Sequence, residues 1–427
     1  MAQQLFFSRD TKVYIKKGDF VWDLPVLDGF SFSQATNSSE ITLAEMEGTG
    51  GVSRRGRKQF NDSLAPAEWS FSTYVRPFTS AGSGTGAADT SGKVHAIEEI
   101  LWALFSGPAT YASNAFTNQT VHDGTDLDID FSESNKATLG TADIFFVLGD
   151  ANRKVYKLAD CVVNEASLDF DIDGIATINW SGMSSEIIDM TTKTHTTATS
   201  GSVFPPAFDA HRDGGTVDIV AGDVVLNATD AHRMSVVVDP TSSGTATMTG
   251  AVYESTTATD NFIRNRLTQL TVIPTAGTTY IGSLEAAGYD ITLTGGNITM
   301  SNNVTFITPE EIGLVNTPIG HVTGTRSVSG SMNCYLSKDT TANDNSADLW
   351  EDLKSITSVV TNSFALVFKI GGATASTARL EVSLPTCHLE IPTHSIEDVI
   401  SVETAFNALP STIDGTNEAT LKYFPKV

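Results

Sequence analysis

Alternation of apolar and polar residues with a period of two is the feature that most constrains this chain. Apolar and polar side chains alternate over short stretches such as 69–75, 167–172 and 176–180, with Thr73 as the one exception, and turns rich in Gly, Asn, Asp and Thr bound such stretches. Such alternation sends successive side chains to opposite faces of a strand. Helical periodicity of useful length occurs only over 94–105 and 347–356. The pattern therefore predicts a mainly β fold with two helices.

The two predicted helices occur in matching contexts, which indicates an internal duplication. In each half an amphipathic strand is followed by a polar loop, the helix, two strands, a cysteine and a final pair of strands. The spacing from Cys161 to Trp180 equals the spacing from Cys387 to Phe406. A fixed order of elements that recurs along a chain is the signature of repeated structural units. The duplication predicts two related β-sandwiches, each flanked by one α-helix.

This duplication divides the chain into three predicted segments. The first β-sandwich domain covers residues 1–200, and the second covers 261–427. Between them, 201–260 is predicted to be a linker with a small β-rich insertion. The linker begins in a Thr/Ser/Gly-rich stretch at 191–202, followed by two prolines that cannot continue a strand ladder.

Charge and composition exclude several classes of protein. The chain has 26 Lys and Arg against 50 Asp and Glu, a net charge of −24, which disfavours binding of nucleic acid through a basic face. It shows no signal peptide and no apolar run long enough to cross a membrane, so we expect a soluble chain made in a cytoplasm, without a membrane anchor. Three cysteines without CxxC spacing indicate neither a disulfide framework nor a zinc ribbon.

Enzymatic activity is not expected from the motifs present. The chain has no G-x-S-x-G, no P-loop and no H-E-x-x-H, and its eight histidines are scattered. Distant residues can still converge in a fold, so missing motifs lower the odds of an enzyme without closing the question. We predict no catalytic residues, no cofactor and no metal site.

Two fragments of metal-binding patterns have simpler interpretations. Residues 169–174 match the opening of a calcium loop, but the twelfth position is Trp180 where a bidentate Glu is needed. A strand with an acidic face that enters a turn explains them better. Cys387, His388 and His394 could supply zinc ligands, but strand alternation points the first two to opposite faces.

A basic cluster is unusual in so acidic a chain. It lies in a Gly-rich stretch between two predicted strands, and it comprises Arg54, Arg55, Arg57 and Lys58. Such a run is either a solvated loop or a docking element for an acidic neighbour. The matching region of the second half carries Glu310 and Glu311. The hypothesis is that a basic loop of one subunit contacts an acidic loop of another, in a contact sensitive to salt.

The arrangement of these elements resembles a known family. An N-terminal strand and long loop, an amphipathic strand, one helix and hairpins that end in a pattern like that of 167–182 are similar to the major tail tube proteins of long-tailed bacteriophages. The opening through Gly29 and the loop at 54–57 also look like that family. The resemblance covers both halves, so it implies two tube domains fused in one chain.

The resemblance implies a structural virion protein of the phage tail. In that family each tube domain is a β-sandwich flanked by one helix, its sheet joins those of its neighbours in a closed ring, and rings stack through a long loop. Two domains per chain would make homotrimeric, pseudo-hexameric rings that form a hollow tube for DNA passage into the host. The implied partners are the chain itself, with tape-measure, tail-terminator and tail-tip or baseplate proteins; DNA is only passing cargo.

An acidic chain suits such a conduit, because a negative lumen repels the passing polyanion. The candidate lumen-lining residues are Asp169, Asp171, Asp173, Glu397 and Asp398.

Two other functions compete with this hypothesis. A β-sandwich surface adhesin would share the Thr-rich strands and the acidity, but the missing signal peptide and disulfides argue against it. Another virion structural subunit, such as a head decoration or sheath protein, is compatible with the duplication.

Overall fold

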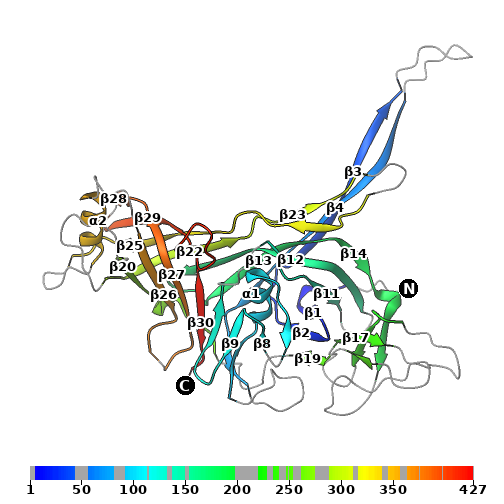
Figure 1. The fold of residues 1–427 in the computed structure, drawn as a ribbon, viewed down its shortest axis with the longest axis horizontal. Coiled ribbons are helices and arrows are strands. Elements are labelled where there is room, and N and C mark those ends of the chain that lie inside the picture. Colours follow the sequence, from blue (N-terminus) through cyan, green and yellow to red (C-terminus); the bar gives the residue numbers. More distant parts are fainter. Residues whose placement is uncertain are drawn as a thin grey trace, which may run out of the picture.

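The computed structural model has a broad β-rich body from which one hairpin projects as a long arm (Figure 1). The predicted mainly β class is confirmed. The structure describes residues 5–43, 56–80, 92–112, 115–131, 137–149, 153–197, 220–227, 234–239, 247–248, 250–252, 261–274, 288–310, 316–338, 345–355, 363–374, 376–396 and 398–426.

The first half of the chain contributes fourteen strands and one helix to the described fold. The strands are β1 Lys12–Lys17, β2 Phe20–Leu24, β3 Ser31–Thr42, β4 Arg57–Tyr74, β5 Pro77–Thr79, β6 Val94–Ala96, β7 Tyr111–Ala112, β8 Ala115–Phe116, β9 Thr120–His122, β10 Leu127–Asp130, β11 Ala142–Leu148, β12 Lys154–Asp171, β13 Thr177–Ser184 and β14 Glu186–Asp189. The helix is α1, Glu99–Ser106.

The remaining strands belong to the middle segment and the second half. The middle strands are β15 Thr194–Thr197, β16 Val224–Asn227, β17 Met234–Asp239, β18 Thr247–Met248 and β19 Gly250–Val252. The second half contains α2 Ser346–Ser355 and the strands β20 Gln269–Pro274, β21 Tyr289–Ile291, β22 Leu293–Ser301, β23 Thr305–Ile307, β24 Gly320–Val322, β25 Ser327–Tyr335, β26 Phe364–Ile370, β27 Arg379–Leu389, β28 Thr393–Ile396, β29 Ile400–Ala408 and β30 Thr420–Phe424.

The two halves pair their strands in the same pattern. Strand β1 pairs with β2 and β11, as β20 pairs with β21 and β26. The ladders β11·β12 and β26·β27 each contain one irregularity, next to Cys161 in the first half and Cys387 in the second. In both places the thiol donates to the carbonyl three residues earlier, at 3.3 Å from Leu158 O and 3.7 Å from Leu384 O. The equal cysteine spacing in the sequence thus corresponds to equal positions beside a bulge.

One sheet runs through both halves without a break. Strand β12 of the first half pairs with β22 of the second, from Glu165 opposite Ser301 to Asp171 opposite Gly295. A second connection joins β10 to the C-terminal strand β30. The main hydrophobic core is correspondingly continuous and includes buried residues of both halves. The division at 1–200 and 261–427 stays a prediction, and the halves share one core.

Helix α1 is held in place by the second half. Trp102 of α1 packs edge-on against Trp180 at a ring distance of 4.7 Å, and its indole N–H donates to the Tyr423 hydroxyl at 2.7 Å. At the helix C-terminus, Asn302 and Arg326 donate to the carbonyls of Phe105 and Ser106, at 2.9 and 2.8 Å. Carbonyls at a helix end have no partner within the helix, so these side chains supply what the helix lacks.

Helix α1 differs from the sequence prediction at its first turn, whereas helix α2 agrees with it. The prediction of a helix from Val94 is wrong for its first residues, because β6 pairs with β5 over Val94–Ala96 and α1 begins at Glu99. Tertiary pairing outweighs the helical period there. Helix α2 agrees closely with 347–356, and its first turn is capped by Asn345, whose side-chain Oδ1 accepts from the Asp348 N–H at 3.2 Å.

The described part of the middle segment packs on the outside of the first half. Strands β15 to β18 form a small sheet, and β19 adds to the main sheet beside β2. Val224, Leu226 and Met234 cover Tyr14 and Phe145 in a separate hydrophobic cluster. The described strands within 201–260 are β16 to β19, and β19 extends the sheet of the first half. The division of the chain at 201–260 stays a prediction.

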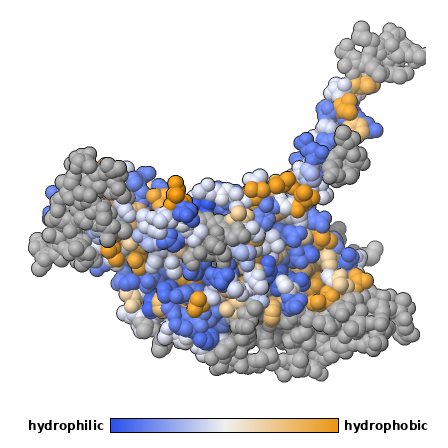
Figure 2. Space-filling model, in the orientation of Figure 1, coloured by the Kyte–Doolittle hydropathy of each residue, from blue (hydrophilic) through white to orange (hydrophobic). Residues whose placement is uncertain are grey.

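The arm is the outer part of the β3·β4 hairpin, which leaves the body in Figure 1. The ladder continues to Thr42 opposite Arg57. Beside its base lies the short β23·β24 hairpin, joined to β4 through a Ser63–Asn316 bridge. Figure 2 shows hydrophobic residues on the arm and next to its base. The exposed apolar side chains there include Ile41 and Phe60 on the arm and Ile307, Ile319 and Val322 beside its base.

A polar sheet face as the candidate functional surface

One face of the continuous sheet is apolar and buried, and the opposite face is polar. We define the polar sheet face as the outward positions of β3, β4, β13, β12, β22, β25, β29 and β28, which follow one another in the sheet. Because side chains alternate along each strand, Trp180 of β13 and Phe406 of β29 face the core, and the residues before and after each of them face the polar side. The polar side chains are mostly hydroxyls and amides: Ser70, Ser72, Ser167, Asn179, Ser181, Asn297, Thr299, Ser301, Ser329, Ser331, Asn333 and Asn407.

These polar side chains form rows that cross the sheet from the first half into the second. One row runs through six strands in exact cross-strand register, from Ser72 to Asn407: Ser72, Asn179, Ser167, Thr299, Ser329 and Asn407. Residues directly opposite one another in adjacent strands are within reach of each other's side chains. The row therefore forms an uninterrupted polar stripe across both halves of the chain.

Many of these polar side chains form hydrogen bonds with one another between the strands. Ser72 donates to Asn179 Oδ1 at 2.6 Å, and Asn179 Nδ2 donates to Asp169 Oδ2 at 3.0 Å. At the junction of the two halves, the hydroxyls of Ser167 and Thr299 lie 3.3 Å apart. Polar side chains that are hydrogen-bonded to each other have fixed rotamers and present fewer free donors and acceptors to a passing molecule.

The charge on this face is negative throughout. Glu68, Glu165, Asp169 and Glu403 lie on it at exposed or half-buried positions. The eight described strand segments that form it, 31–34, 66–74, 164–171, 177–184, 293–301, 327–335, 393–396 and 400–408, contain no Lys or Arg. A surface with carboxylates and no cations repels a polyanion at every position.

The predicted acidic residues do not all lie on this face. Asp169 and Asp171 lie on it, at exposed positions of β12. Asp173 follows in the exposed turn, where Arg266 approaches it at 3.8 Å, and the predicted strand with an acidic face entering a turn is confirmed. Asp398 is exposed in the bend between β28 and β29, and Glu397 lies outside the described residues.

Sequence reasoning missed Glu68, Glu165 and Glu403 as members of the polar sheet face. Each occupies an outward position in a strand whose neighbours alternate, so the local signal was present. What the sequence did not supply was the order of the strands, which brings the three carboxylates to one face.

Both ends of the eight-strand series have a free edge. Among the described residues, β3 pairs only with β4, and β28 pairs only with β29. Near β28 the exposed apolar side chains include Ile391, Ile396 and Val399. An unpaired strand edge next to exposed apolar side chains is a template for pairing with another chain.

The basic cluster lies on the arm as far as the structure describes it. Arg57 and Lys58 open β4, whereas Arg54 and Arg55 lie outside the described residues. Arg57 is 3.7 Å from Glu40 across the hairpin, and the Lys58 ammonium lies 5.1 Å from the centre of the Phe60 ring. Glu310 is exposed beyond β23, beside the arm base, and Glu311 is outside the described residues.

The second-half cysteine and histidines do not converge on one site. Cys387 is buried and His388 is exposed, because they lie on opposite faces of β27. His394 is exposed on β28, where its ring meets Trp350 edge-on at 4.8 Å. Burial raises the pKa of the Cys387 thiol to about 12 and that of Cys334 to about 11, so neither thiol ionises near neutral pH.

No helix among the described residues is long and apolar enough to span a membrane. No protein-family model matches the chain. A curated relative is the protein described as tail tube protein pb6 of Escherichia phage T5, 28% identical over 408 residues. The alignment covers 95% of this chain and 71% of the relative. This similarity confirms the resemblance to phage tail tube proteins predicted from the sequence.

Proposed function

We propose that this chain, a structural subunit of a phage tail tube, builds the tube from rings of three chains in which the two halves of each chain are quasi-equivalent. The chain is a component of the virion tail that assembles with itself and with other tail parts. The finer proposal concerns how chains join, which surface faces the lumen and how rings stack.

The observation that carries the trimeric ring is the β12·β22 ladder. Within each half the sheet has the same four-strand order, β3-β4-β13-β12 in the first and β22-β25-β29-β28 in the second. Strand β12, at the end of the first series, pairs with β22, at the beginning of the second series. If the halves are quasi-equivalent, β28 of one chain pairs in the same manner with β3 of the next. The free edges are then the ones a ring would close.

The register of this joint follows from the internal one. Trp180 lies opposite Phe71, and its counterpart Phe406 lies opposite Gly330. Their preceding residues, Ser70 and Ser329, lie opposite Ser31 and Thr299, so Ser31 of the first half corresponds to Thr299 of the second. Leu389 lies opposite Phe406 and the Glu390 N–H donates to Ala405 O, so Glu390 corresponds to Ser167, which lies opposite Thr299. We therefore expect Glu390 of one chain to lie opposite Ser31 of the next.

A ring closed in this way would have an open lumen. Three chains with eight strands each exceed the roughly 16 strands at which β-barrels begin to enclose a water-filled channel. Because the core covers the apolar side of the sheet, the polar sheet face is the side left to line the channel. Its carboxylates and paired hydroxyls would repel DNA and give it little to bind.

The proposed role is structural and not enzymatic. The relative is described as a tail tube protein, and the polar sheet face has hydrogen-bonded serines and asparagines where an enzyme would have a converging set of reactive groups. The same similarity favours the tail tube over the surface adhesin and over a head or sheath subunit. Tape-measure, tail-terminator and tail-tip or baseplate proteins are the proposed partners, and DNA is the passing cargo.

Cysteines at Ser31 and Glu390 are expected to cross-link neighbouring chains in assembled tubes. Directly opposite residues of an antiparallel ladder have Cα atoms about 4.5–5.5 Å apart, within the range that a disulfide spans. The double variant should therefore give dimers and a terminal trimer on a non-reducing gel. The three native cysteines are buried and should not compete.

Pairing Ser31→Cys with Ile413→Cys provides the control, because Ile413 is fully exposed on the loop before β30. This control should remain monomeric under the same oxidation. A ladder of bands that extends beyond three chains would contradict the trimer, and a monomer in the Ser31/Glu390 variant would contradict the joint.

The arm is the proposed contact between stacked rings. It projects from the body, carries exposed apolar side chains and has its basic residues toward the outer end (Figure 1). Beside its base lies Glu310, so an arm that reaches the next ring brings Arg57 and Lys58 toward an acidic region there. The pairing of basic and acidic loops predicted from the sequence would then be an axial contact between subunits.

Replacing Arg57 and Lys58 by glutamate is expected to shorten tubes without preventing rings. Exposed ion pairs contribute about 0.2–1 kcal/mol each, but the effect is repeated in every subunit of a ring. Tube lengths measured by electron microscopy at low and high salt are the readout. Wild-type tubes should shorten as salt rises, and a variant with unchanged lengths at low salt would exclude these residues from the stacking contact.

A further inference from the structure

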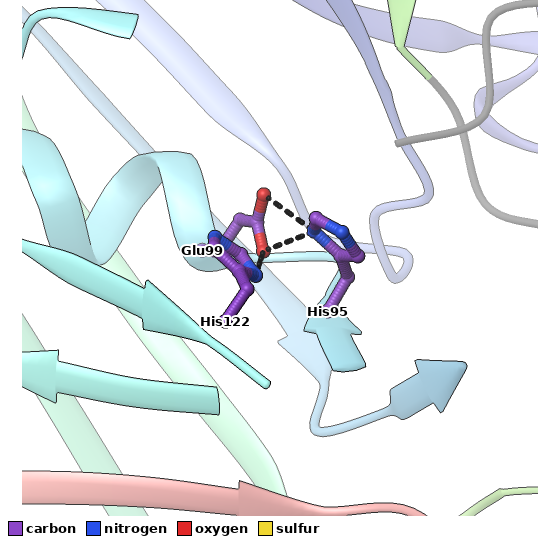
Figure 3. Close-up of side chains that lie close together, drawn as sticks. All are labelled: His95, Glu99 and His122. Carbon is purple, nitrogen blue, oxygen red and sulfur yellow. Dashed lines mark hydrogen bonds and ion pairs between the residues drawn. The ribbon is translucent and has the colours of Figure 1, made fainter. Parts of the chain in front are cut away.

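Two histidines and a glutamate that are far from the polar sheet face converge inside the first half (Figure 3). His95 lies in β6, Glu99 in the first turn of α1 and His122 at the end of β9. Their side chains are 1%, 3% and 5% exposed, respectively. The proposed tube function uses none of these three residues.

The ligand atoms of the three side chains point toward one another. His95 Nδ1 lies 3.1 and 3.2 Å from the two carboxylate oxygens of Glu99, and His122 Nδ1 lies 4.0 Å from one of them. One ligand atom from each residue lies within 4.8 Å of the others. A tetrahedral zinc ion with bonds of about 2.0–2.1 Å holds its ligand atoms about 3.3 Å apart. The His95–Glu99 distances are close to this spacing, and His122, at 4.0 Å from Glu99 and within 4.8 Å of His95, needs to approach by up to about 1.5 Å.

The polar contacts of both rings lie on one side. Among the described residues, Nε2 of His95 and Nε2 of His122 have no hydrogen-bond partner. The Nδ1 atoms of both rings face Glu99. His122 Nδ1 also donates to the carbonyl oxygen of Val94 at 2.8 Å, so a metal ion on this nitrogen displaces its proton and replaces that hydrogen bond.

The cluster is buried and contains carboxyl groups. The Glu99 side chain is 3% exposed, and the adjacent Glu98 is fully buried. A buried carboxylate is costly unless a proton or the positive charge of a cation balances it.

Protons on the histidines could provide this charge only in part. The two imidazole rings lie 4.1 Å apart between centres, so protonating both would place two like charges in contact within a buried region. One bound dication neutralises the carboxylate and engages both rings without this repulsion. We propose that His95, Glu99 and His122 bind one divalent transition-metal ion of the zinc type.

The chemistry of the donors suits such an ion. Two imidazole nitrogens and one carboxylate oxygen are typical ligands of Zn²⁺ and of its Co²⁺ and Ni²⁺ substitutes, whereas Ca²⁺ and Mg²⁺ prefer oxygen ligands alone. Because the three side chains are buried, the ion enters as the chain folds. It ties β6 and α1 to β9, and β9 leads through β10 to the C-terminal strand β30. The metal therefore stabilises the region where the second half closes on the first.

Metal analysis of the purified full-length chain tests this proposal. Protein unfolded in guanidinium with a chelator is refolded with either Zn²⁺ or the chelator, dialysed and analysed for zinc by mass spectrometry. We expect about one zinc per chain after refolding with Zn²⁺. Refolding with Co²⁺ should give the intense visible absorption of a tetrahedral site. Zinc below a tenth of an equivalent, or a Co²⁺ spectrum of an octahedral aqueous ion, overturns the proposal.

Glu99→Gln and His122→Gln variants assign the metal to these residues. Each variant should retain at most about a tenth of the zinc that the wild type retains. The control variant His388→Ala, which changes an exposed histidine, should retain a full equivalent. If Glu99→Gln fails to fold, the wild-type comparison still decides, because the zinc-refolded protein should melt at a higher temperature than the chelator-refolded one. Equal melting temperatures with equal metal content indicate an imidazolium–carboxylate pair and overturn the metal site.

Discussion

A chain carrying lysine at Glu68, Glu165, Asp169 and Glu403 is expected to form tubes that retain DNA in their lumen. These four carboxylates lie on the polar sheet face, where the described strand segments contain no cation. Four charge reversals per chain would turn a repelling wall into an attracting one. Six to ten phosphate contacts weaken an affinity by roughly 10³–10⁵-fold between 50 and 200 mM salt, so DNA should bind the lysine tubes at least about 10³-fold more tightly at 50 than at 200 mM salt, and its release should be slowest at low salt.

Two measurements check this expectation. Triggered DNA release from virions follows the rate directly, and co-sedimentation of labelled DNA with purified tubes follows binding as salt is raised. The isosteric variant with Gln or Asn at the same four positions separates loss of repulsion from gained attraction, and we expect it to bind no DNA. A matched pair of reversals at the exposed Glu351 and Asp414 should leave release unchanged. Lysine tubes that bind no DNA at any salt would mean that the polar sheet face does not line the lumen.

Replacing Trp180 by alanine is expected to lower the free energy of unfolding by about 3–5 kcal/mol. The indole is 1% exposed, packs edge-on against Trp102 at 4.7 Å and donates to the Thr73 hydroxyl at 2.9 Å. Its removal opens a cavity below α1 and leaves Thr73 without this donor, and each of these effects is destabilising. Denaturant unfolding of the unassembled chain, followed by intrinsic fluorescence and circular dichroism together, gives the difference.

Trp180→Phe and Tyr74→Ala serve as controls for this substitution. Phenylalanine keeps most of the buried ring, so its cost should be less than half that of alanine. Tyr74 is half-buried in the neighbouring strand, where a cost near 1 kcal/mol is typical of a site outside the core. A loss of less than about 1 kcal/mol for Trp180→Ala would show that the two tryptophans are not part of the cooperative core.

The sequence predicted secondary structure correctly where a segment showed a single hydrophobic periodicity and no distant strand competed with it. Alternation over 167–172 predicted the strand that the structure contains in β12, and the helical period predicted α2 almost to the residue. The prediction for α1 was wrong at Val94–Ala96, where pairing with Pro77–Thr79 decides the conformation. A residue distant in the chain can supply backbone hydrogen bonds that a local pattern does not reveal.

Candidate site residues were predicted less completely than the strands. Asp169 was found because acidic residues alternate visibly with Phe170 and its neighbours. Glu165 and Glu403 are single acidic residues in alternating strands, and only the order of the strands brings them to the same face. His95 and Glu99 are four residues apart, but nothing in the sequence brought His122 to them. Convergence of side chains depends on which loops cross, and that is set by the packing of the whole domain.

The sequence by itself determined the fold class, the faces of the individual strands, the family resemblance and the acidic balance of this protein. These properties are encoded within a few residues, because periodicity sends side chains to one face and composition sets charge. The tertiary structure alone decided that β12 pairs with β22, that Arg326 and Asn302 complete α1, and that β3 and β28 each keep one unpaired edge in the part of the chain that the structure describes. The first two depend on contacts between segments more than 100 residues apart, which compete with many alternative pairings and are selected only when the whole core closes.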